Sequence, residues 1–270
     1  MSPLPLPSYT ILEMLHNGTR SMVFRGQRKG DGCPVVIKQL KAEYPTLEQL
    51  TRLRQEYQLA DQLAQAIGSD CILKPYALEP CGNGWAIVLE DFGGRSLRDY
   101  TRQQPLALRT FFMIALALTE ALSVIHQQGI IHKDIKPSNI LFNPETQQVK
   151  LADFSVAIAL HQEQQPLVNP TLIQGTLAYM SPEQTGRMNR RIDYRTDFYA
   201  LGVTFYELLS GRLPFEADNP MELVHCHIAR EALPLDVLTQ AAPAPVPRVL
   251  AQIVAKLMAK NAEDRYQSFH

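Results

Sequence analysis

The spacing of apolar and polar positions divides the chain into a sheet-forming part and a helical part. Over residues 8–90, short β-branched or aromatic runs such as MVFRG, PVVIK and WAIVLE are separated by turn residues, which predicts a small antiparallel sheet. Residues 47–67 of this part have their apolar positions at steps of three and four instead. That period predicts an amphipathic helix with one face against the sheet.

Helical periods dominate after the DFGG sequence of residues 91–94. Gly93 and Gly94 mark a hinge, so we expect an N-lobe of residues 1–92 and a C-lobe of residues 93–270. The apolar run FFMIALALTEALSVI is too short to cross a bilayer and is broken by Glu120, which favours a buried helix. The main helices of the C-lobe are predicted over residues 96–103, 106–128, 197–210 and 246–260.

Composition and charge mainly exclude classes of partner and of cysteine-based sites. With 46% hydrophobic and 20% charged residues the chain is typical of a soluble globular protein. A net charge of -1 argues against broad binding to nucleic acid or anionic membranes, so neither is expected as a partner. The N-terminal MSPLPLPSYT lacks the features of a secretory signal, so we expect a cytoplasmic protein. No metal-ligand or disulfide spacing connects the four cysteines, Cys33, Cys71, Cys81 and Cys226.

Candidate chemistry is concentrated in the segment IIHKDIKPSNILF, residues 130–142. Phosphoryl transfer needs a carboxylate to orient the acceptor, a cation on the migrating group and metal ions on the phosphates. Asp134, Lys136 and Asn139 supply these three kinds of group within six residues, between apolar flanks that hold the backbone. Asp153, in VKLADFS, follows a short predicted strand and suits a metal ligand. A hairpin between ILF and VKL would bring Asp153 beside Asn139.

In their order and spacing these motifs resemble the eukaryotic-type Ser/Thr protein kinase family. HKDIKPSN stands where the family has HRDxKxxN, DFS stands for DFG, VVIK for VAIK, and GTLAYMSPE for the segment that ends in APE. The resemblance covers nearly the whole chain. It implies a bilobal α+β fold, ATP and magnesium as cofactors, and transfer of the γ-phosphate to Ser or Thr hydroxyls of protein substrates.

The resemblance also implies roles for individual residues. Asp134 and Lys136 are expected to be catalytic, together with Lys38 and its ion-pair partner Glu56. Glu43 and Glu48 precede Glu56, which is favoured by its central place on the amphipathic helix. Asn139 and Asp153 are the expected metal ligands. The expected nucleotide-binding residues are Gly18, Val23, Val36, Lys38, Leu89, Glu90, Phe92, Asn139, Leu141 and Asp153.

Three further positions have structural roles in the family. Asp197 corresponds to the buried aspartate at the start of a central helix, and Arg265 is expected to pair with Glu183. His132 is predicted to be a packed histidine. Three other histidines, His126, His225 and His227, are predicted to be ordinary helix residues.

The chain departs from the family at three places. The glycine-rich loop keeps only Gly18, and either the side chains of His16 and Arg20 crowd the triphosphate or Arg20 supplies a compensating charge. Ser155 replaces the glycine of DFG and restricts the backbone beside Asp153. Lys133 replaces an arginine and lacks its planar fork, which predicts weak dependence on activation-loop phosphorylation. In that loop Thr171 is the candidate phosphosite and Thr176 the expected contact to the catalytic loop.

Three functions compete. The first is an active protein kinase, the second a pseudokinase that serves as a nucleotide-binding or scaffolding module, and the third a small-molecule kinase, against which Lys136 and GTLAYMSPE argue. The run EQTGRMNRRIDYRTDFYALGVTFYELL also resembles kinase domains that head large bacterial signalling proteins, which predicts downstream sensor or histidine-kinase modules. The family usually continues through another helix after the position of Arg265, so we expect a chain that is truncated at its C-terminus. Its arginines 187, 190, 191 and 195 form either a docking site for an acidic partner or a solvated loop.

Overall fold

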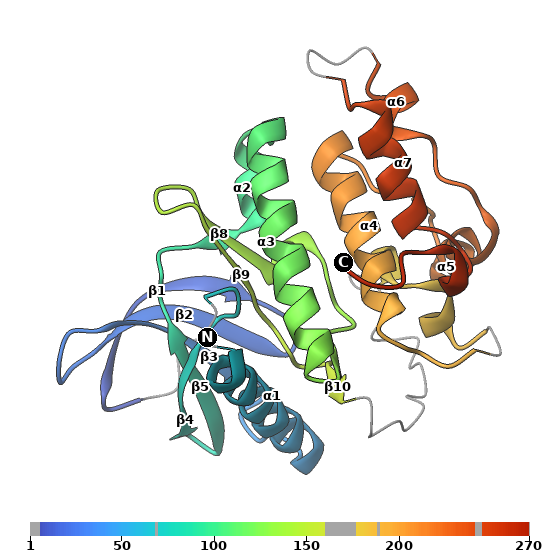
Figure 1. Ribbon diagram of the computed structural model, residues 1–270. Coiled ribbons are helices and arrows are strands. Elements are labelled where there is room, and N and C mark those ends of the chain that lie inside the picture. Colours follow the sequence, from blue (N-terminus) through green and yellow to red (C-terminus); the bar gives the residue numbers. More distant parts are fainter. Residues whose placement is uncertain (1–5, 68–69, 160–176, 188–189, 241–244, 270) are drawn as a thin grey trace. The chain divides into compact units, whose positions relative to one another are not determined.

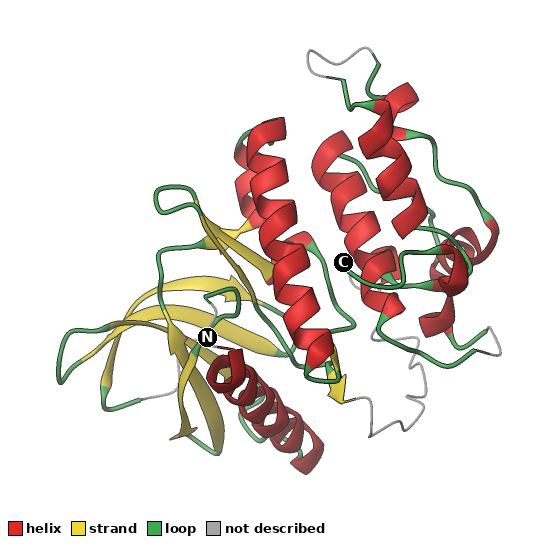
Figure 2. Ribbon diagram, viewed as in Figure 1, coloured by secondary structure: helices red, strands yellow, loops and turns green. Residues whose placement is uncertain are grey.

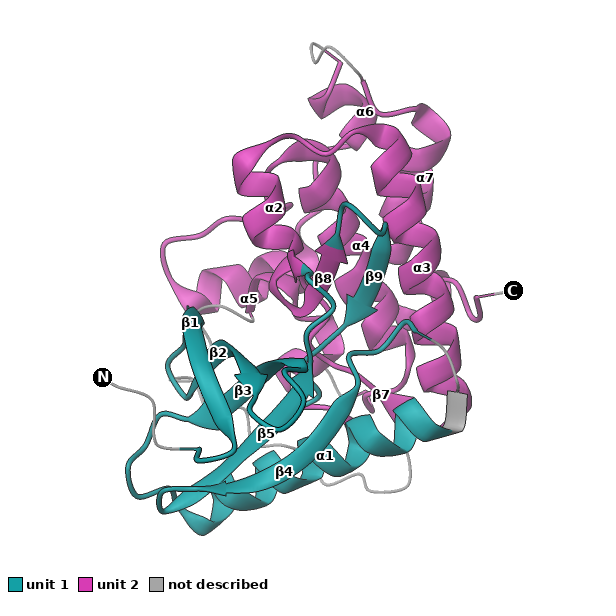
Figure 3. Ribbon diagram, turned by 90° about the vertical axis from the view of Figure 1, so that its left-hand side faces the viewer, with its two compact units in different colours: residues 1–94, 143–155 teal, residues 95–142, 156–270 magenta. Residues whose placement is uncertain are grey.

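The computed structural model describes residues 6–67, 70–159, 177–187, 190–240 and 245–269. It contains two compact units, which Figure 3 shows in different colours. Unit 1 comprises residues 1–94 and 143–155, and unit 2 comprises residues 95–142 and 156–270. The sequence places the boundary after Phe92, whereas unit 1 extends to Gly94 and also takes in a later segment that carries Asp153. Thr171 and Thr176 lie outside the described residues.

Unit 1 is built on the predicted antiparallel sheet, whose strand order is β1-β2-β3-β5-β4 (Figure 1). Side chains alternate between its faces, so Val35, Ile37 and Gln39 of β3 are buried on one side, while Val36 and Lys38 face the other. A further strand, β9 (Gln148–Leu151), makes a parallel bridge from Leu151 to Ile72. The sheet strands are β1 (Tyr9–Asn17), β2 (Ser21–Arg28), β3 (Pro34–Leu40), β4 (Pro75–Cys81) and β5 (Gly84–Glu90).

The helix of unit 1, α1, spans Leu47–Ile67 as the sequence predicts. Thr46 begins it with a reciprocal cap, in which the Thr46 hydroxyl accepts from the N–H of Gln49 and the Gln49 amide oxygen accepts from the N–H of Thr46. Leu53, Ala60 and Leu63 are buried on one face, which packs against β4 and β5. Glu56 lies on this same buried face, which places a carboxylate beside the sheet.

Unit 2 is mostly helical, as Figure 2 shows, with α4 in contact with both α3 and α7. Its helices are α2 (Leu97–Gln103), α3 (Leu108–Gln127), α4 (Arg195–Ser210), α5 (Pro220–Ala229), α6 (Leu235–Leu238) and α7 (Arg248–Leu257). Four of them match the predicted helices to within three residues at each end, and α5 and α6 were not predicted. Short 3₁₀ turns complete the unit: η1 (Pro137–Asn139), η3 (Leu177–Tyr179), η4 (Pro182–Thr185) and η5 (Ala262–Asp264).

The apolar run that the sequence places in a buried helix forms α3. By length and composition alone α3 could cross a membrane, but one face of it lies in the core of unit 2. Phe111 meets the ring of Phe205 on α4 edge to face, with ring centroids 5.2 Å apart. The buried residues of α3 recur at steps of three and four: Phe111, Ile114, Leu118, Ala121, Leu122 and Ile125.

Two short strand pairs flank the segment that carries the candidate chemistry. β7 (Ile130–Ile131) pairs with β10 (Ile158–Ala159), and β6 (Arg95–Ser96) pairs with β8 (Ile140–Asn143). Ile130, Ile131, Ile135 and Ile140 are all at most 1% exposed. The buried flanks therefore fix the backbone on both sides of Asp134, as the sequence predicts.

Candidate active site

Unit 1 brings three of the predicted site residues together around one ammonium group. The Nζ atom of Lys38 lies 2.6 Å from Glu56 Oε1 and 2.9 Å from Asp153 Oδ1. Lys38 comes from β3, Glu56 from α1 and Asp153 from the residues after β9. Glu48, by contrast, forms an exposed pair with Arg52 on its own helix. Glu56 is therefore the helical glutamate that pairs with Lys38.

Burial and mutual attraction set the charges of this group in opposite ways. Burial disfavours the Lys38 ammonium, but the carboxylates of Asp153 and Glu56 outweigh it and raise the lysine pKa, so Lys38 is protonated at neutral pH. For Glu56 burial dominates over the attraction of Lys38 and raises its pKa to about 7. Glu56 thus titrates close to neutral pH.

We expect the phosphoryl-transfer rate to fall as the pH drops below about 7, because a protonated Glu56 no longer holds Lys38 by charge. The Glu56→Gln variant should be slower at pH 8, by up to about a hundredfold from misplacement of Lys38, and should lack this acid limb. The effect of lower pH on folding stability is opposite to its effect on the rate. Because the pKa of Glu56 in the folded protein exceeds its ordinary 4.5, lowering the pH from about 7 towards 4.5 favours the folded state at this residue.

A pH–rate profile of the wild type and of Glu56→Gln checks this expectation. Glu48→Gln is the matched control, because it makes the same change on the exposed face of α1. An acid limb that persists unchanged in Glu56→Gln would assign the titration to another group.

Asp153 has a left-handed backbone conformation, with φ at 67°. Such a conformation is costly for a residue other than glycine and is typically kept at functional sites. The carboxylate stabilises it locally, since Oδ1 accepts a 3.4 Å hydrogen bond from the N–H of Ser155 as well as the contact from Lys38. This donor is a backbone N–H, so the replacement of the family glycine by Ser155 keeps it.

Unit 2 brings together the second predicted group, Asp134, Lys136 and Asn139. One carboxylate oxygen of Asp134, Oδ2, accepts from Lys136 Nζ at 2.6 Å and from Asn139 Nδ2 at 2.8 Å. The same Asn139 nitrogen also donates to the carbonyl of Asp134 at 2.9 Å. Among the described residues, no group donates to the other oxygen, Oδ1, although it is buried. The carboxylate is therefore oriented through one oxygen while the other keeps its accepting capacity.

Asp197 anchors the backbone of this segment from the first turn of α4. Its carboxylate accepts from the N–H of His132 at 2.9 Å and from that of Lys133 at 2.8 Å, and it is fully buried. These bonds stabilise Lys133 in a left-handed conformation, with φ at 68°. His132 is fully buried, which agrees with the prediction of a packed histidine.

Two histidines predicted to be ordinary helix residues have specific partners, and that prediction was wrong for them. His126 Nε2 lies 2.9 Å from Asp197 Oδ2. His227 is fully buried with Nδ1 2.9 Å from the hydroxyl of Tyr199, and burial lowers its pKa to about 4. Both partners lie on α4, far away in sequence, so a search at helical spacing could not find them.

The predicted ion pair between Glu183 and Arg265 is present and buried. Arg265 donates from Nη1 to Glu183 Oε1 at 2.6 Å and from Nη2 to Oε2 at 2.9 Å. Thr196 also donates to Oε1 at 2.8 Å. Next to Glu183, the side chain of Gln184 donates to the carbonyl of Lys133. The segment of residues 181–185 is thus connected both to the end of the chain and to the catalytic segment.

Comparison with known proteins agrees with this geometry. Residues 9–269 match the protein kinase domain family. The chain belongs to the protein kinase family. It is 32% identical over 96% of its length to a probable serine/threonine-protein kinase of Corynebacterium efficiens, and 30% identical over 97% to the serine/threonine-protein kinase pkn2 of Myxococcus xanthus. It is 33% identical over 77% of its length to the serine/threonine-protein kinase PknB of Mycobacterium tuberculosis.

The chain spans 39%, 31% and 33% of the lengths of these three relatives, in that order. The kinase domain is therefore the part of them that the chain matches. Members of the family use ATP and a divalent metal, and they act on protein substrates.

In this kinase domain the glycine-poor loop closes as a tight turn between β1 and β2. The N–H of Gly18 donates to the carbonyl of Ser21, and Lys41 Nζ donates to Asn17 Oδ1 at 3.0 Å and to the carbonyl of Gly18. A Cβ atom at Gly18 would lie 3.0 Å from the Ser21 carbonyl oxygen. The retained Gly18 thus lies where a side chain would crowd the backbone of the turn, while His16 and Arg20 are exposed.

The predicted base-binding side chains of unit 1 lie on one face of the kinase sheet. Val23 is directly opposite Lys38, and Val36 is directly opposite Leu89 in the next strand pair. All four are partly exposed, whereas Val35 and Ile37, which point to the other face, are fully buried. Glu90 is the last residue of β5, and Phe92 follows two residues later. In unit 2, Leu141 lies on β8 beside Asn139 in the sequence.

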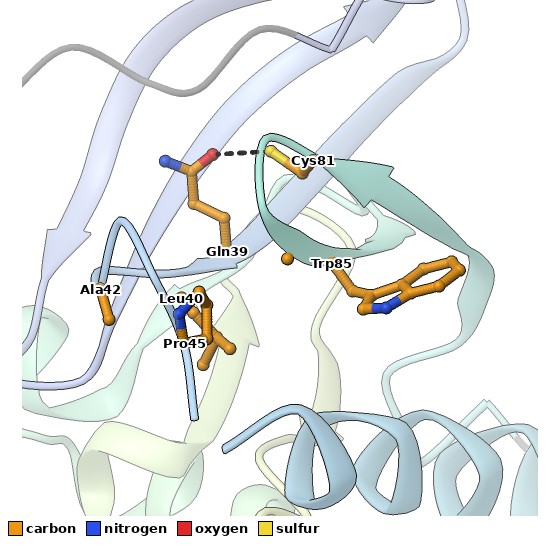
Figure 4. A pocket seen from close by; sticks show the side chains of 7 residues that line it. Gln39, Leu40, Ala42, Pro45, Cys81 and Trp85 are labelled. Carbon is orange, nitrogen blue, oxygen red and sulfur yellow. Dashed lines mark hydrogen bonds between the residues drawn. The ribbon is translucent and has the colours of Figure 1, made fainter. Parts of the chain in front are cut away.

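A shallow surface hollow lies at the end of β3 (Figure 4). Buried Gln39 accepts a 3.6 Å hydrogen bond from Cys81 Sγ through its amide oxygen, and among the described residues its amide nitrogen has no partner. None of the predicted site residues lines this hollow. The lining residues are Gln39, Leu40, Ala42, Pro45, Cys81, Gly84 and Trp85.

Proposed function

We propose that this kinase domain is catalytically active and transfers the γ-phosphate of ATP to Ser or Thr hydroxyls of protein substrates. The observation that carries the proposal is the state of Asp134. One of its oxygens is held by Lys136 and Asn139, and the other is buried with no donor among the described residues. Such an oxygen suits a substrate hydroxyl, which must be oriented and must lose its proton during attack.

The other residues have complementary roles in this proposal. Lys136 bears positive charge next to the attacking oxygen and can reach the migrating phosphoryl group. Lys38, fixed by Glu56, binds the α- and β-phosphates. Its pairing with Glu56 is the arrangement that an active kinase requires, and the 2.6 Å ion pair supports activity over a scaffolding role.

The donor atoms of Asn139 and Asp153 fit magnesium. Both amide nitrogen contacts of Asn139 go to Asp134, and within the described part of the chain its amide oxygen has only a 3.4 Å contact from Ser138. Asp153 offers a carboxylate. Mg²⁺ prefers oxygen ligands and takes few from the protein when phosphates supply the rest. When bound it would neutralise charge on the phosphates, and Asn139 and Asp153 are each a candidate ligand for it.

The pseudokinase alternative rested on the eroded glycine loop and on DFS. The comparisons do not favour it, because the relatives are named serine/threonine protein kinases. The loop closes through its own hydrogen bonds, and Ser155 supports Asp153 through its N–H. The same names weigh against a small-molecule kinase.

Transfer of labelled phosphate from ATP to a protein acceptor tests the proposal. The wild type should transfer label with Mg²⁺ and lose this activity when EDTA removes the metal. Asp153→Asn should reduce the rate by at least about a hundredfold at fixed Mg²⁺, because the amide is a weaker ligand and a weaker partner for Lys38. Asp61→Asn, on the outer side of α1, is the matched control. Absence of transfer by the folded wild type would support the scaffolding alternative.

The wider setting of the domain is also a proposal. The likeness of residues 183–209 to domains that head large bacterial signalling proteins supports a role in bacterial signalling, attached sensor or histidine-kinase modules and a cytoplasmic location. It supports protein substrates rather than nucleic acid or membrane as partners. Arg190 pairs with Glu263 and Arg195 with Asp193, so half of the four-arginine cluster is already neutralised, which favours a solvated loop over a docking site.

A further inference from the structure

The linker that begins at the last residue of β5, residues 90–94, is held by side chains from other parts of unit 1. At its first residue, Glu90 Oε1 lies 2.7 Å from the Nζ atom of Lys150 on β9 and also accepts from the N–H of Lys74 at 2.7 Å. Lys150 is only 3% exposed although it is a lysine. A lysine this deeply buried needs a partner, and Glu90 provides the close one.

The second linker residue is fixed by another cation. Arg25 Nε donates to Asp91 Oδ2 at 2.6 Å, and Arg25 Nη1 also pairs with Glu13. The remaining oxygen of Asp91, Oδ1, accepts from the N–H of Gly93 at 2.9 Å. Gly93 has φ at 74°, so this turn requires a residue that tolerates the left-handed region.

The third linker residue, Phe92, is held through its carbonyl and its ring. Asn143 Nδ2 donates to the Phe92 carbonyl at 2.6 Å. The ring lies 5.3 Å from Lys150 Nζ on one side, and a Cβ atom at Gly94 would be 2.2 Å from it on another. Among the described residues, nothing accepts a hydrogen bond from the N–H of Phe92.

We propose that Lys150 and Asn143 are positioning residues that preorganise this linker for recognition of the nucleotide base. Asn143 fixes the Phe92 carbonyl, and the Phe92 N–H, which has no acceptor among the described residues, is a donor suited to an acceptor nitrogen on the edge of a heteroaromatic base. Lys150 holds the linker through two contacts, its ion pair with Glu90 and its contact with the ring of Phe92. A backbone that is already ordered binds its ligand without the cost of ordering it. This inference rests on the proposed function, which requires ATP binding.

Steady-state kinetics of Lys150→Met test the proposal. We expect KM for ATP to rise about tenfold, as for the loss of one well-placed interaction, while kcat at saturating ATP stays within about twofold. Lys150→Arg, which keeps the charge, should recover most of the affinity. Lys29→Met, the same change at an exposed lysine of the β2–β3 turn, should leave both constants unchanged.

A purely structural role for Lys150 would give a different result. It would lower the folded fraction, and therefore kcat, without a selective rise in KM. Because Lys150→Met leaves the Glu90 carboxylate without its cation, the double variant Glu90→Gln with Lys150→Met is measured as well; it should fold and still show the raised KM. Asn143→Ala should raise KM in the same selective way.

Two outcomes are kept apart by calorimetric titration with a non-hydrolysable ATP analogue. If the folded Lys150 and Asn143 variants bind the analogue as tightly as the wild type and have the wild-type KM for ATP, the positioning role alone is overturned. Failure of the folded wild type to bind the analogue would overturn the proposed function together with it.

Discussion

Replacing Asp134 by asparagine should slow phosphoryl transfer by about 10² to 10⁴-fold, the range for removal of a positioned general base. The substitution keeps the shape of the side chain but removes its negative charge. It also places an amide where two donors, Lys136 Nζ and Asn139 Nδ2, now converge on one carboxylate oxygen. The amide then either turns its nitrogen towards these donors or points it at the substrate hydroxyl. In both cases the enzyme loses the basic carboxylate that takes up the proton of the substrate hydroxyl.

Initial rates with labelled ATP, together with binding of an ATP analogue, check this expectation. Binding should change little, because Asp134 acts on the acceptor hydroxyl rather than on the base or the α-phosphate. Asp218→Asn, at an exposed aspartate of the same unit, is the control and should retain full activity. If folded Asp134→Asn keeps more than about a tenth of the wild-type rate, Asp134 is not the base.

Much of the fold could be predicted because local patterns decide it. The bounds of α1 coincide with those predicted, since its three- and four-residue apolar period is uninterrupted from Leu47. The antiparallel sheet was equally clear from its short β-branched runs and turns. The helix α6 was missed because it has only four residues, and α5 was missed because its first residue is Pro220, which reads as part of a turn.

The candidate site could be predicted where its residues form contiguous motifs. Asp134, Lys136 and Asn139 bond to one another within six residues, so the motif itself contains the geometry. Lys38 and Glu56 were found through the family resemblance combined with the helical face of Glu56. Here the sequence supplies the residues, and the fold supplies the 2.6 Å contact.

The residues that support the site could not be predicted, because their partners are distant in sequence. Lys150 reads as the polar position of a strand in VKL, yet it is buried against Glu90, sixty residues earlier. His126 meets Asp197 across seventy-one residues. Neither contact leaves a local pattern, because a buried lysine in a strand has the same sequence neighbours as an exposed one. The same holds for a histidine in a helix. Only tertiary packing distinguishes them.

Replacing Arg265 by methionine should lower the free energy of unfolding by about 3 to 5 kcal/mol, the range for removing one partner of a buried ion pair. The Arg265 side chain is 0% exposed and donates to both oxygens of Glu183. It also donates to the carbonyls of Arg195, Ala259 and Lys260, which would lose their donor. Methionine fills the volume but leaves a buried carboxylate without a cation. Arg265→Lys should recover only part of the loss, because an ammonium cannot make the two parallel bonds of a guanidinium.

The pH dependence of unfolding identifies the ion pair as the cause. Burial alone would raise the pKa of Glu183, but Arg265 outweighs it and holds the pKa below its ordinary 4.5. In the wild type the pair therefore contributes stability that is present above pH 4.5 and is lost as the pH falls through the lower folded-state pKa of Glu183.

In Arg265→Met the unpaired Glu183 should have a raised pKa, so protonation at acid pH relieves the cost of burying its carboxylate. The difference between the two proteins in urea unfolding should thus be largest at neutral pH. It should begin to shrink above pH 4.5, as Glu183 of the variant takes up a proton, and shrink further below pH 4.5, as the wild-type pair is lost. Arg191→Met, at an exposed arginine, should stay within about 0.5 kcal/mol of the wild type at every pH. A difference for Arg265→Met that does not vary with pH would assign its effect to lost packing and carbonyl contacts instead of charge.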